Sequence, residues 1–191
     1  MATDQRSWLR RERQFVCGIV TDAGREYPRR SWVHPDLRVG SSSIQGSGLF
    51  TEHALHAGVV VARLGGTPVD NQALADLQPH SSLSIGEGTS LVQGADDPAQ
   101  FMNHSCDSGC WMADEVTVVT RRSIGAGEEV TLDYALVSAD PEWRMECQCG
   151  SDLCRGVVTG NDWKLPDVQE RYRNHFSPFI NQRVAALRAS I

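Results

Sequence analysis

Short apolar runs separated by glycine turns fill the middle of the chain. Three of these runs are Val59–Ala62, Ser90–Val92 and Glu115–Val119. Because the runs are this short and are bounded by turn residues, they predict buried strands rather than helices. The turns include Gly46–Gly48, Gly65–Gly66, Gly86–Gly88 and Gly125–Gly127. Asn71–Leu77 is the best short helical candidate in this region, so the pattern predicts a small, twisted, mostly β domain.

The two ends of the chain have a different pattern. Apolar residues recur at helical spacing near the C-terminus, at Val168, Tyr172, Phe176, Phe179, Ile180, Val184 and Leu187. They predict two helices, one from about Asp167 to His175 and one that ends near Leu187, on either side of Pro178. Packing on the β domain is the simplest use of this apolar face, and dimerisation is the alternative. Near the N-terminus, Ser7–Val20 could form a helix.

The composition and net charge limit the location and the binding partners that we expect for the protein. Hydrophobic residues make up 40% of the 191 residues, and the formal net charge is −6. No apolar run approaches the length of a membrane span and no signal peptide opens the chain, so we expect no membrane contact and a cytoplasmic location. The acidic balance provides no overall basic field, so direct nucleic-acid binding is not expected. It would suit a cationic substrate, although solubility alone is the simpler explanation.

The cysteines are clustered in a way that favours a metal site. Cys147, Cys149 and Cys154 follow the spacing C-x-C-x4-C, and in a reducing compartment such clusters bind metal rather than form disulfides. A structural zinc ion needs four ligands, so a fourth must come from elsewhere. Cys106 is the predicted fourth ligand, and Cys110 is the alternative. Four thiolates leave no position open for water, so the single predicted Zn(II) ion is structural.

Four separated segments together resemble one protein family. They are Gly46–Phe50, Phe101–Cys106, Gly127–Tyr134 and the cysteine cluster. Each is weak or moderate evidence alone, but in this order they resemble the SET-domain protein lysine methyltransferases with a post-SET zinc knuckle. The resemblance implies a mostly β fold with C-terminal helices, comprising a β-clip SET domain with a pseudoknot and a zinc-binding post-SET segment. It divides the chain into an N-terminal extension, a SET domain, a post-SET knuckle and a C-terminal helical extension, at residues 1–36, 37–137, 138–160 and 161–191.

The same resemblance implies S-adenosylmethionine as the cofactor and a lysine side chain in a protein or peptide as the acceptor. Its cofactor contacts would come from Gln45, Gly46, Ser47, Gly48, Asn103, His104 and Tyr134. Glycine at the turn would let the backbone approach the cofactor closely. Tyr134 is the predicted catalytic residue, because its phenol can orient a neutral amine and the methyl group through directional contacts. Lysine has a pKa of about 10.4 in water, so an apolar channel must favour its neutral form.

Several positions depart from the family pattern. Leu132 is expected to line the substrate channel at a position that is usually aromatic, and Ser81 or a neighbour replaces an expected tyrosine. Ser108 and Gly109 stand where proline and asparagine are common. Two alternatives therefore stay open: methylation of another residue or a small amine, and a catalytically silent, zinc-stabilised cofactor-binding module. The chain is expected to be a monomer, or a homodimer through its C-terminal helices.

Overall fold

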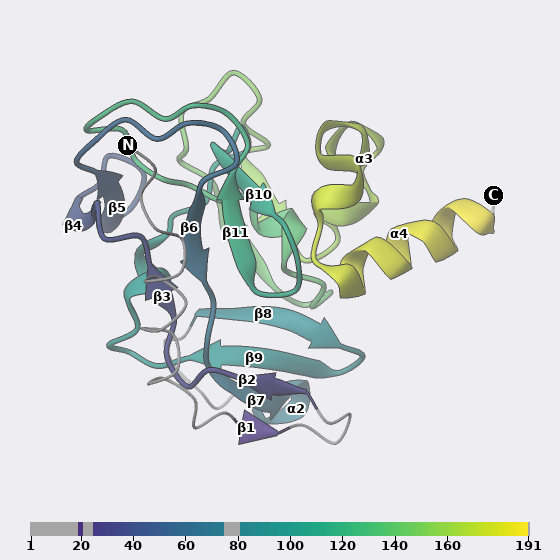
Figure 1. Cartoon of the computed structure of the whole chain (residues 1–191). Helices are drawn as coiled ribbons and strands as arrows, with labels where there is room; N and C mark the ends of the chain where they lie inside the picture. Colours follow the sequence, from purple (N-terminus) through teal and green to yellow (C-terminus); the bar gives the residue numbers. More distant parts are fainter. Residues whose placement is uncertain (1–18, 21–24, 75–80, 191) are drawn as a thin grey trace.

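The computed structural model describes residues 19–20, 25–74 and 81–190. Within these residues the fold is mostly β, with its longest helix at the C-terminal end (Figure 1). This agrees with the predicted fold class. None of the helices in this part of the chain combines the length and hydropathy needed to cross a membrane.

Two antiparallel sheets form the body of the protein. The larger has the strand order β10-β11-β6-β3, with bounds Cys110–Met112, Thr117–Thr120, Val60–Arg63 and Trp32–Val33. The second has the order β7-β9-β8, with bounds Thr67–Asp70, Thr89–Gln93 and Ser81–Gly86. Figure 1 shows the second sheet below the first. The predicted strands at Val59–Ala62, Ser90–Val92 and Glu115–Val119 are confirmed as β6, β9 and β11, each within two residues at either end.

Three two-stranded sheets complete the β structure in the part of the chain that the structure describes. They pair β1 with β2, β4 with β5, and β12 with β13, with bounds Ile19–Val20, Glu26–Tyr27, Leu37–Ser41, Ser47–Thr51, Arg144–Glu146 and Val157–Thr159. The predicted helix Ser7–Val20 lies outside the described residues except at its end, where it is wrong because Ile19 and Val20 form a strand. β3 lies within the predicted N-terminal extension, yet it pairs with β6 of the larger sheet.

The helices are few and short before the C-terminal end. The α-helices of the described residues are α2 Asn71–Leu74, α3 Pro166–Tyr172 and α4 Pro178–Ala189. The 3-10 helices are η2 Pro98–Phe101, η3 Tyr134–Leu136, η4 Asp162–Lys164 and η5 Arg173–His175. Ser177 caps α4 by accepting a hydrogen bond from the backbone N–H of Ile180 at 3.5 Å, a usual way to begin a helix. α3 and α4 confirm the two predicted C-terminal helices, whereas only Asn71–Leu74 of the predicted Asn71–Leu77 helix is described.

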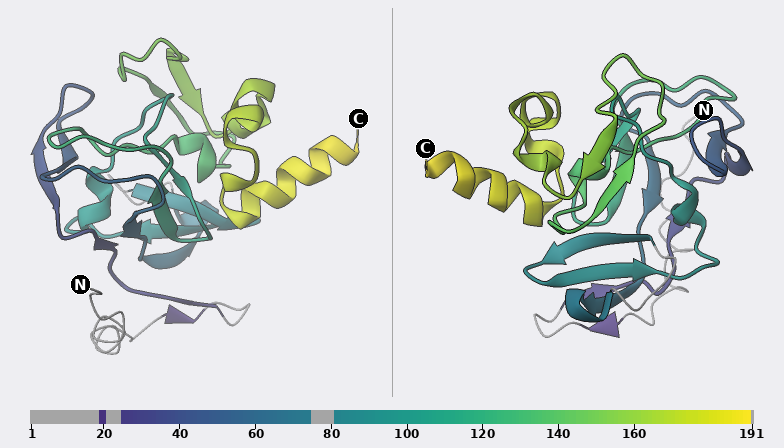
Figure 2. Two further views of the ribbon diagram at one scale, coloured as in Figure 1. Left: turned by 45° about the horizontal axis from the view of Figure 1, so that its top comes forward. Right: turned by 180° about the vertical axis from the view of Figure 1, so that it is seen from behind.

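The C-terminal helices pack on the β domain through the predicted apolar residues. Val168, Tyr172, Phe176, Ile180 and Val184 are buried and belong to the same hydrophobic cluster as the strands. Figure 2 shows that α4 begins against the body and that its C-terminal end points away from it. The packing prediction is therefore confirmed, while the oligomeric state stays a prediction.

Two segments that are distant in the sequence lie side by side and create the site. Leu132 donates its backbone N–H to Asn103 O at 3.0 Å, and Ser105 donates to Leu132 O at 3.2 Å. His104 and Leu132 form a parallel bridge. These bonds bring the Asn103–Cys106 segment against the segment that ends at Tyr134.

Candidate active site and metal centre

Two clefts meet at the predicted site. The first has a volume of about 840 Å³ and is lined by β8 and β9 together with Met102, Asn103, Leu132 and Tyr134. The second, of about 670 Å³, lies between residues 42–46 and the start of the cysteine knuckle, and His104 lines it. Gln45, Gly46 and Trp143 line both clefts. A ligand in one cleft could therefore approach a ligand in the other at these shared residues.

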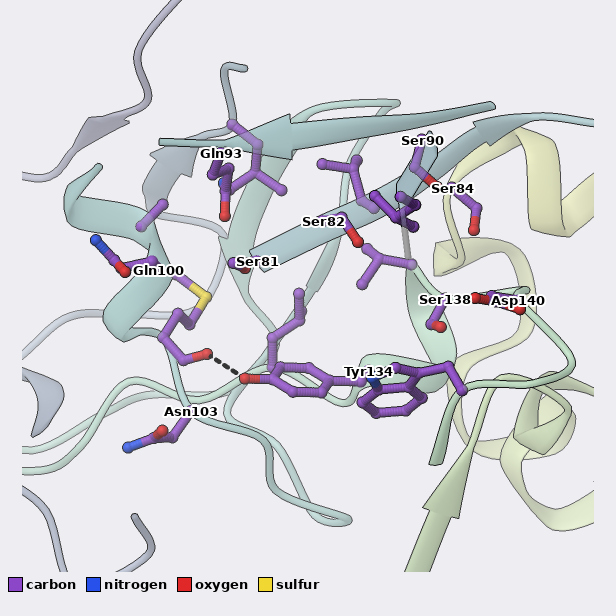
Figure 3. Close-up of a pocket in the computed structure, with 18 of the residues that line it drawn as sticks. Ser81, Ser82, Ser84, Ser90, Gln93, Gln100, Asn103, Tyr134, Ser138 and Asp140 are labelled. Carbon is purple, nitrogen blue, oxygen red and sulfur yellow. Dashed lines mark hydrogen bonds between the residues drawn. The ribbon is translucent and has the colours of Figure 1, made fainter. Parts of the chain in front are cut away.

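Tyr134 occupies the floor of the first cleft (Figure 3). Its hydroxyl donates a hydrogen bond to Met102 O at 3.1 Å. Its ring lies 5.2 Å from that of His104 and 6.0 Å from that of Trp143, centroid to centroid. Burial, assisted by the negative charge of Glu129, raises the pKa of Tyr134 to about 12. The phenol is therefore neutral at physiological pH and is fixed by one hydrogen bond and two ring contacts.

His104 links Tyr134 to the cysteines. Its ring is buried, and Nδ1 accepts a hydrogen bond from the backbone N–H of Tyr134 at 3.1 Å. Burial lowers the pKa of His104 to about 4, so the ring is neutral near pH 7. With Nδ1 as acceptor, the proton is assigned to Nε2, which lies 3.2 Å from Cys106 Sγ. These contacts use both ring nitrogens to hold the site together, and the predicted cofactor contact of His104 stays a prediction.

The tip of the β4–β5 hairpin is held by Asn103. Its Nδ2 lies 3.2 Å from Gln45 O, 3.0 Å from Ser47 O and 2.7 Å from Glu129 Oε1. Gly46 has a φ of +49°, a conformation that favours glycine, and a Cβ there would meet nothing within 4 Å. The hairpin therefore presents an open, glycine-containing turn beside both clefts.

Gly48 has a different environment from the one expected of a turn residue. It lies inside β5, and a Cβ at this position would overlap the carboxylate of Glu129 and come within 3.2 Å of Asn103 Nδ2. Glycine is therefore needed at position 48 to admit these two side chains. The predicted contact between Gly48 and a cofactor stays a prediction.

Four cysteines converge at the predicted metal centre. The Sγ atoms of Cys106, Cys147, Cys149 and Cys154 all lie within 4.8 Å of one another. Zn–S bonds of about 2.3 Å place the sulfurs of a tetrahedral site about 3.8 Å apart, and Cys106 Sγ and Cys147 Sγ are 3.8 Å apart. Among the described residues, Cys110 is not part of any such cluster, which favours Cys106 over Cys110 as the fourth ligand.

The clustered thiols differ in how readily they ionise. Burial raises the pKa of Cys106 to about 11. Burial opposes ionisation of Cys149 too, but hydrogen bonds from Ser151 and neighbouring groups outweigh it and lower that pKa to about 6. Four thiolates this close repel one another unless a metal ion balances their charge. The residues present therefore fit one structural zinc ion.

Three residues of the site were not singled out from the sequence. Glu129 holds Asn103, Trp143 lines both clefts, and Arg155 forms ion pairs with Asp133 and Asp162. Glu129 lies within the Gly127–Tyr134 segment and Arg155 directly follows Cys154, so proximity to a motif was the available signal. Trp143 carries no such signal, because it lies between two motifs.

Comparison with known proteins agrees with this geometry. The family model for the SET domain matches residues 46–135. Histone-lysine N-methyltransferase TRX1 of Oryza sativa subsp. japonica is 32% identical over 166 residues, which cover 76% of this chain and 16% of the relative. The H3 lysine-4 specific histone-lysine N-methyltransferase of Cryptococcus neoformans is 29% identical over 139 residues, or 63% of this chain and 9% of the relative. Human histone-lysine N-methyltransferase SETD1A is 28% identical over 140 residues, or 64% of this chain and 8% of the relative.

These relatives are much longer proteins, of which the chain spans less than a fifth. The matched region contains the hairpin tip, the Asn103–Cys106 segment and Tyr134, which are the parts that the fold brings together. Residues 46–135 thus form a SET domain, and the chain belongs to the SET-domain family.

Proposed function

We propose that this protein is an S-adenosylmethionine-dependent N-methyltransferase that acts on a lysine side chain of a protein. The observation that carries the proposal is the meeting of two clefts at Gln45, Gly46 and Trp143, with Tyr134 on the floor of one of them. A methyl transfer needs two ligands that approach each other in line within a site that positions them. We assign the acceptor to the first cleft and the cofactor to the second.

The residues of the second cleft, together with Ser47 and Asn103 from the adjoining lining of the first, fit the cofactor. Bound S-adenosylmethionine supplies an electrophilic methyl group on a sulfonium. Asn103 commits its Nδ2 to neighbouring oxygens, and no donor among the described residues reaches its Oδ1, which can therefore accept from an ammonium group. The open turn at Gly46 would let main-chain atoms of Gln45 and Ser47 approach the ligand. His104, Gly48 and Tyr134 complete the proposed cofactor contacts.

The first cleft suits a lysine-bearing segment. Leu132 and Met102 are buried apolar residues in its lining, and they disfavour the ammonium form of an inserted lysine. The hydroxyl of Tyr134 donates its hydrogen bond to Met102 O, so the lone pairs of the hydroxyl oxygen can accept hydrogen bonds from the amine. Asp140 and Glu142 are the charged residues in the lining that the structure describes, and both are acidic. This charge would favour a cationic substrate.

The zinc knuckle would act as a structural clamp on the second cleft. Cys147 and Gln148 line that cleft, and Cys147 is also one of the four clustered cysteines. A metal ion that ties Cys147 to Cys106 would therefore shape the cofactor cleft without taking part in the chemistry. A reducing, cytoplasmic location belongs to the same proposal, because it keeps the thiols available for metal.

Transfer of a labelled methyl group tests the function. The protein would be incubated with methyl-labelled S-adenosylmethionine and either lysate proteins or purified histones, and modified residues would be identified by mass spectrometry. Histone H3 is a natural first acceptor, because a relative is named for H3 lysine-4. The expected result is label on lysine nitrogen, lost in Tyr134→Phe but kept in Tyr27→Phe, a buried tyrosine that lines neither cleft. Cofactor binding without transfer to any protein would instead support the catalytically silent module.

A further inference from the structure

We propose that Arg155 is a positioning residue that fixes the turn carrying Tyr134 and holds the cysteine knuckle against it. Its catalytic consequence rests on the methyltransferase function proposed above. Arg155 directly follows Cys154, one of the four clustered cysteines. Its side chain leaves the knuckle and enters the SET domain, where it reaches the residue before Tyr134.

The guanidinium of Arg155 makes a two-pronged contact with Asp133. Nη1 donates to Oδ2 at 2.8 Å and Nη2 donates to Oδ1 at 2.7 Å. On its other side, Nε lies 2.7 Å from Asp162 Oδ2. The side chains of Asp133, Arg155 and Asp162 are 0%, 11% and 7% exposed, respectively. Planar, bidentate geometry of this kind is specific to arginine.

Asp133 connects Arg155 to the turn that carries Tyr134. It is the N-cap of the 3-10 turn Tyr134–Leu136, and its Oδ1 accepts a hydrogen bond from the backbone N–H of Ala135 at 3.0 Å. A buried carboxylate that lost its cation would have to move toward water. This movement would disturb the cap and thereby the direction in which the Tyr134 phenol points.

A second series of contacts joins Arg155 to Tyr134 through Cys106 of the metal centre. The backbone N–H of Arg155 lies 3.4 Å from Cys106 Sγ. Cys106 Sγ is 3.2 Å from His104 Nε2, and His104 Nδ1 accepts from the backbone N–H of Tyr134. The contacts therefore form a closed ring from Tyr134 through His104, Cys106, Arg155 and Asp133 back to Tyr134. The contacts that hold the knuckle in this structure therefore also hold the backbone around Tyr134.

Fluorine NMR can test the positioning role without relying on activity. The chain has three tyrosines, at positions 27, 134 and 172, so 3-fluorotyrosine labelling should give three signals that Tyr→Phe variants assign. In zinc-loaded protein, Arg155→Ala should shift or broaden the Tyr134 signal while zinc stays at about one per chain. Arg121→Ala is the matched control: Arg121 pairs with Asp107 at 2.6 Å and lies 5.6 Å from the Tyr172 ring. It should move the Tyr172 signal and leave that of Tyr134 in place.

Kinetics then show whether the positioning matters. Arg155→Ala should lower kcat on the order of 100-fold, as small misplacements of catalytic groups do, whereas Arg121→Ala should leave kcat unchanged. Arg155→Lys keeps the charge but loses the planar fork, so it should give a smaller kcat loss and an intermediate signal position.

Three outcomes would overturn the proposal: an unmoved Tyr134 signal in Arg155→Ala, an unchanged kcat despite a moved signal, or an Arg155→Lys variant identical to wild type. If Arg155→Ala does not fold, the Tyr134 signal and the kcat of Arg155→Lys test the proposal in its place. If wild-type protein transfers no methyl group to any protein, the proposed function fails, and the Tyr134 signal still decides whether Arg155 places the turn.

Discussion

Replacing Tyr134 by phenylalanine should remove most of the turnover while leaving the fold intact. The change deletes one hydroxyl, whose hydrogen bond to Met102 O measures 3.1 Å. Loss of a single neutral hydrogen bond lowers the free energy of unfolding by about 1 kcal/mol. Loss of one preorganised polar group at a reacting centre costs about 100-fold or more in kcat, or roughly 3 kcal/mol of the activation free energy. The catalytic effect should therefore exceed the effect on stability.

Three measurements would separate the effects on catalysis, cofactor binding and stability. They are single-turnover methyl transfer, calorimetric binding of S-adenosylhomocysteine and denaturant unfolding. We expect the binding constant and the unfolding midpoint of Tyr134→Phe to stay close to those of wild type. Wild-type turnover in this variant would show that the phenol does not orient the reacting groups. A loss of turnover that is fully matched by a loss of cofactor binding would show that Tyr134 acts through cofactor binding and does not orient the acceptor amine.

The pH dependence gives a second check on the same residue. The reactive acceptor is the neutral amine, so the rate should rise with pH from neutral toward the pKa of the bound lysine. Tyr134 has a pKa raised to about 12 by burial, so its phenol stays protonated throughout this range. Tyr134→Phe should therefore lower the whole profile without changing its rising slope. A falling limb between about pH 9 and 10 that vanishes in Tyr134→Phe would show that the phenol ionises there, as an unperturbed tyrosine does, and would refute the reasoning.

Three further predictions concern the metal, the product and the packing. Purified protein should carry about one zinc per chain, and Cys149→Ser should lose this zinc and bind S-adenosylhomocysteine more weakly. Full activity of protein that elemental analysis shows to be free of zinc would contradict the role of the knuckle as a clamp. Wild type should form di- or trimethyllysine, because Leu132 offers an apolar wall that cannot hydrogen-bond the amine. Leu132→Tyr should shift the product seen by mass spectrometry toward monomethyllysine. Only monomethyl product from wild type after long incubation would rule out this role of Leu132. Gly160→Ala should lower the free energy of unfolding by about 1–3 kcal/mol through overpacking, since its Cβ would overlap the backbone of Asp140. The control Gly86→Ala, whose Cβ would meet only a threonine Cβ at 3.9 Å, should unfold in urea at a midpoint well above that of Gly160→Ala.

Local spacing along the chain was sufficient to predict the cysteine cluster and the C-terminal helices. Cys147, Cys149 and Cys154 lie within eight residues of one another, so their convergence on one ion needs only a tight loop. The apolar spacing from Val168 to Val184 sufficed to predict two helices and the face that they bury. These features depend on neighbours along the chain, and their periodicity can be read without knowledge of the rest of the fold.

Which distant groups meet depends instead on how the whole fold packs. The choice of Cys106 over Cys110 depends on how one segment crosses another, because the two cysteines are only four residues apart and both are buried. The space at Gly48 is filled by Glu129, and the charge of Asp133 is balanced by Arg155, which lies 22 residues further along the chain. No periodicity or short motif specifies such pairs, since they arise when burial forces a charged or polar group to find a partner from another element.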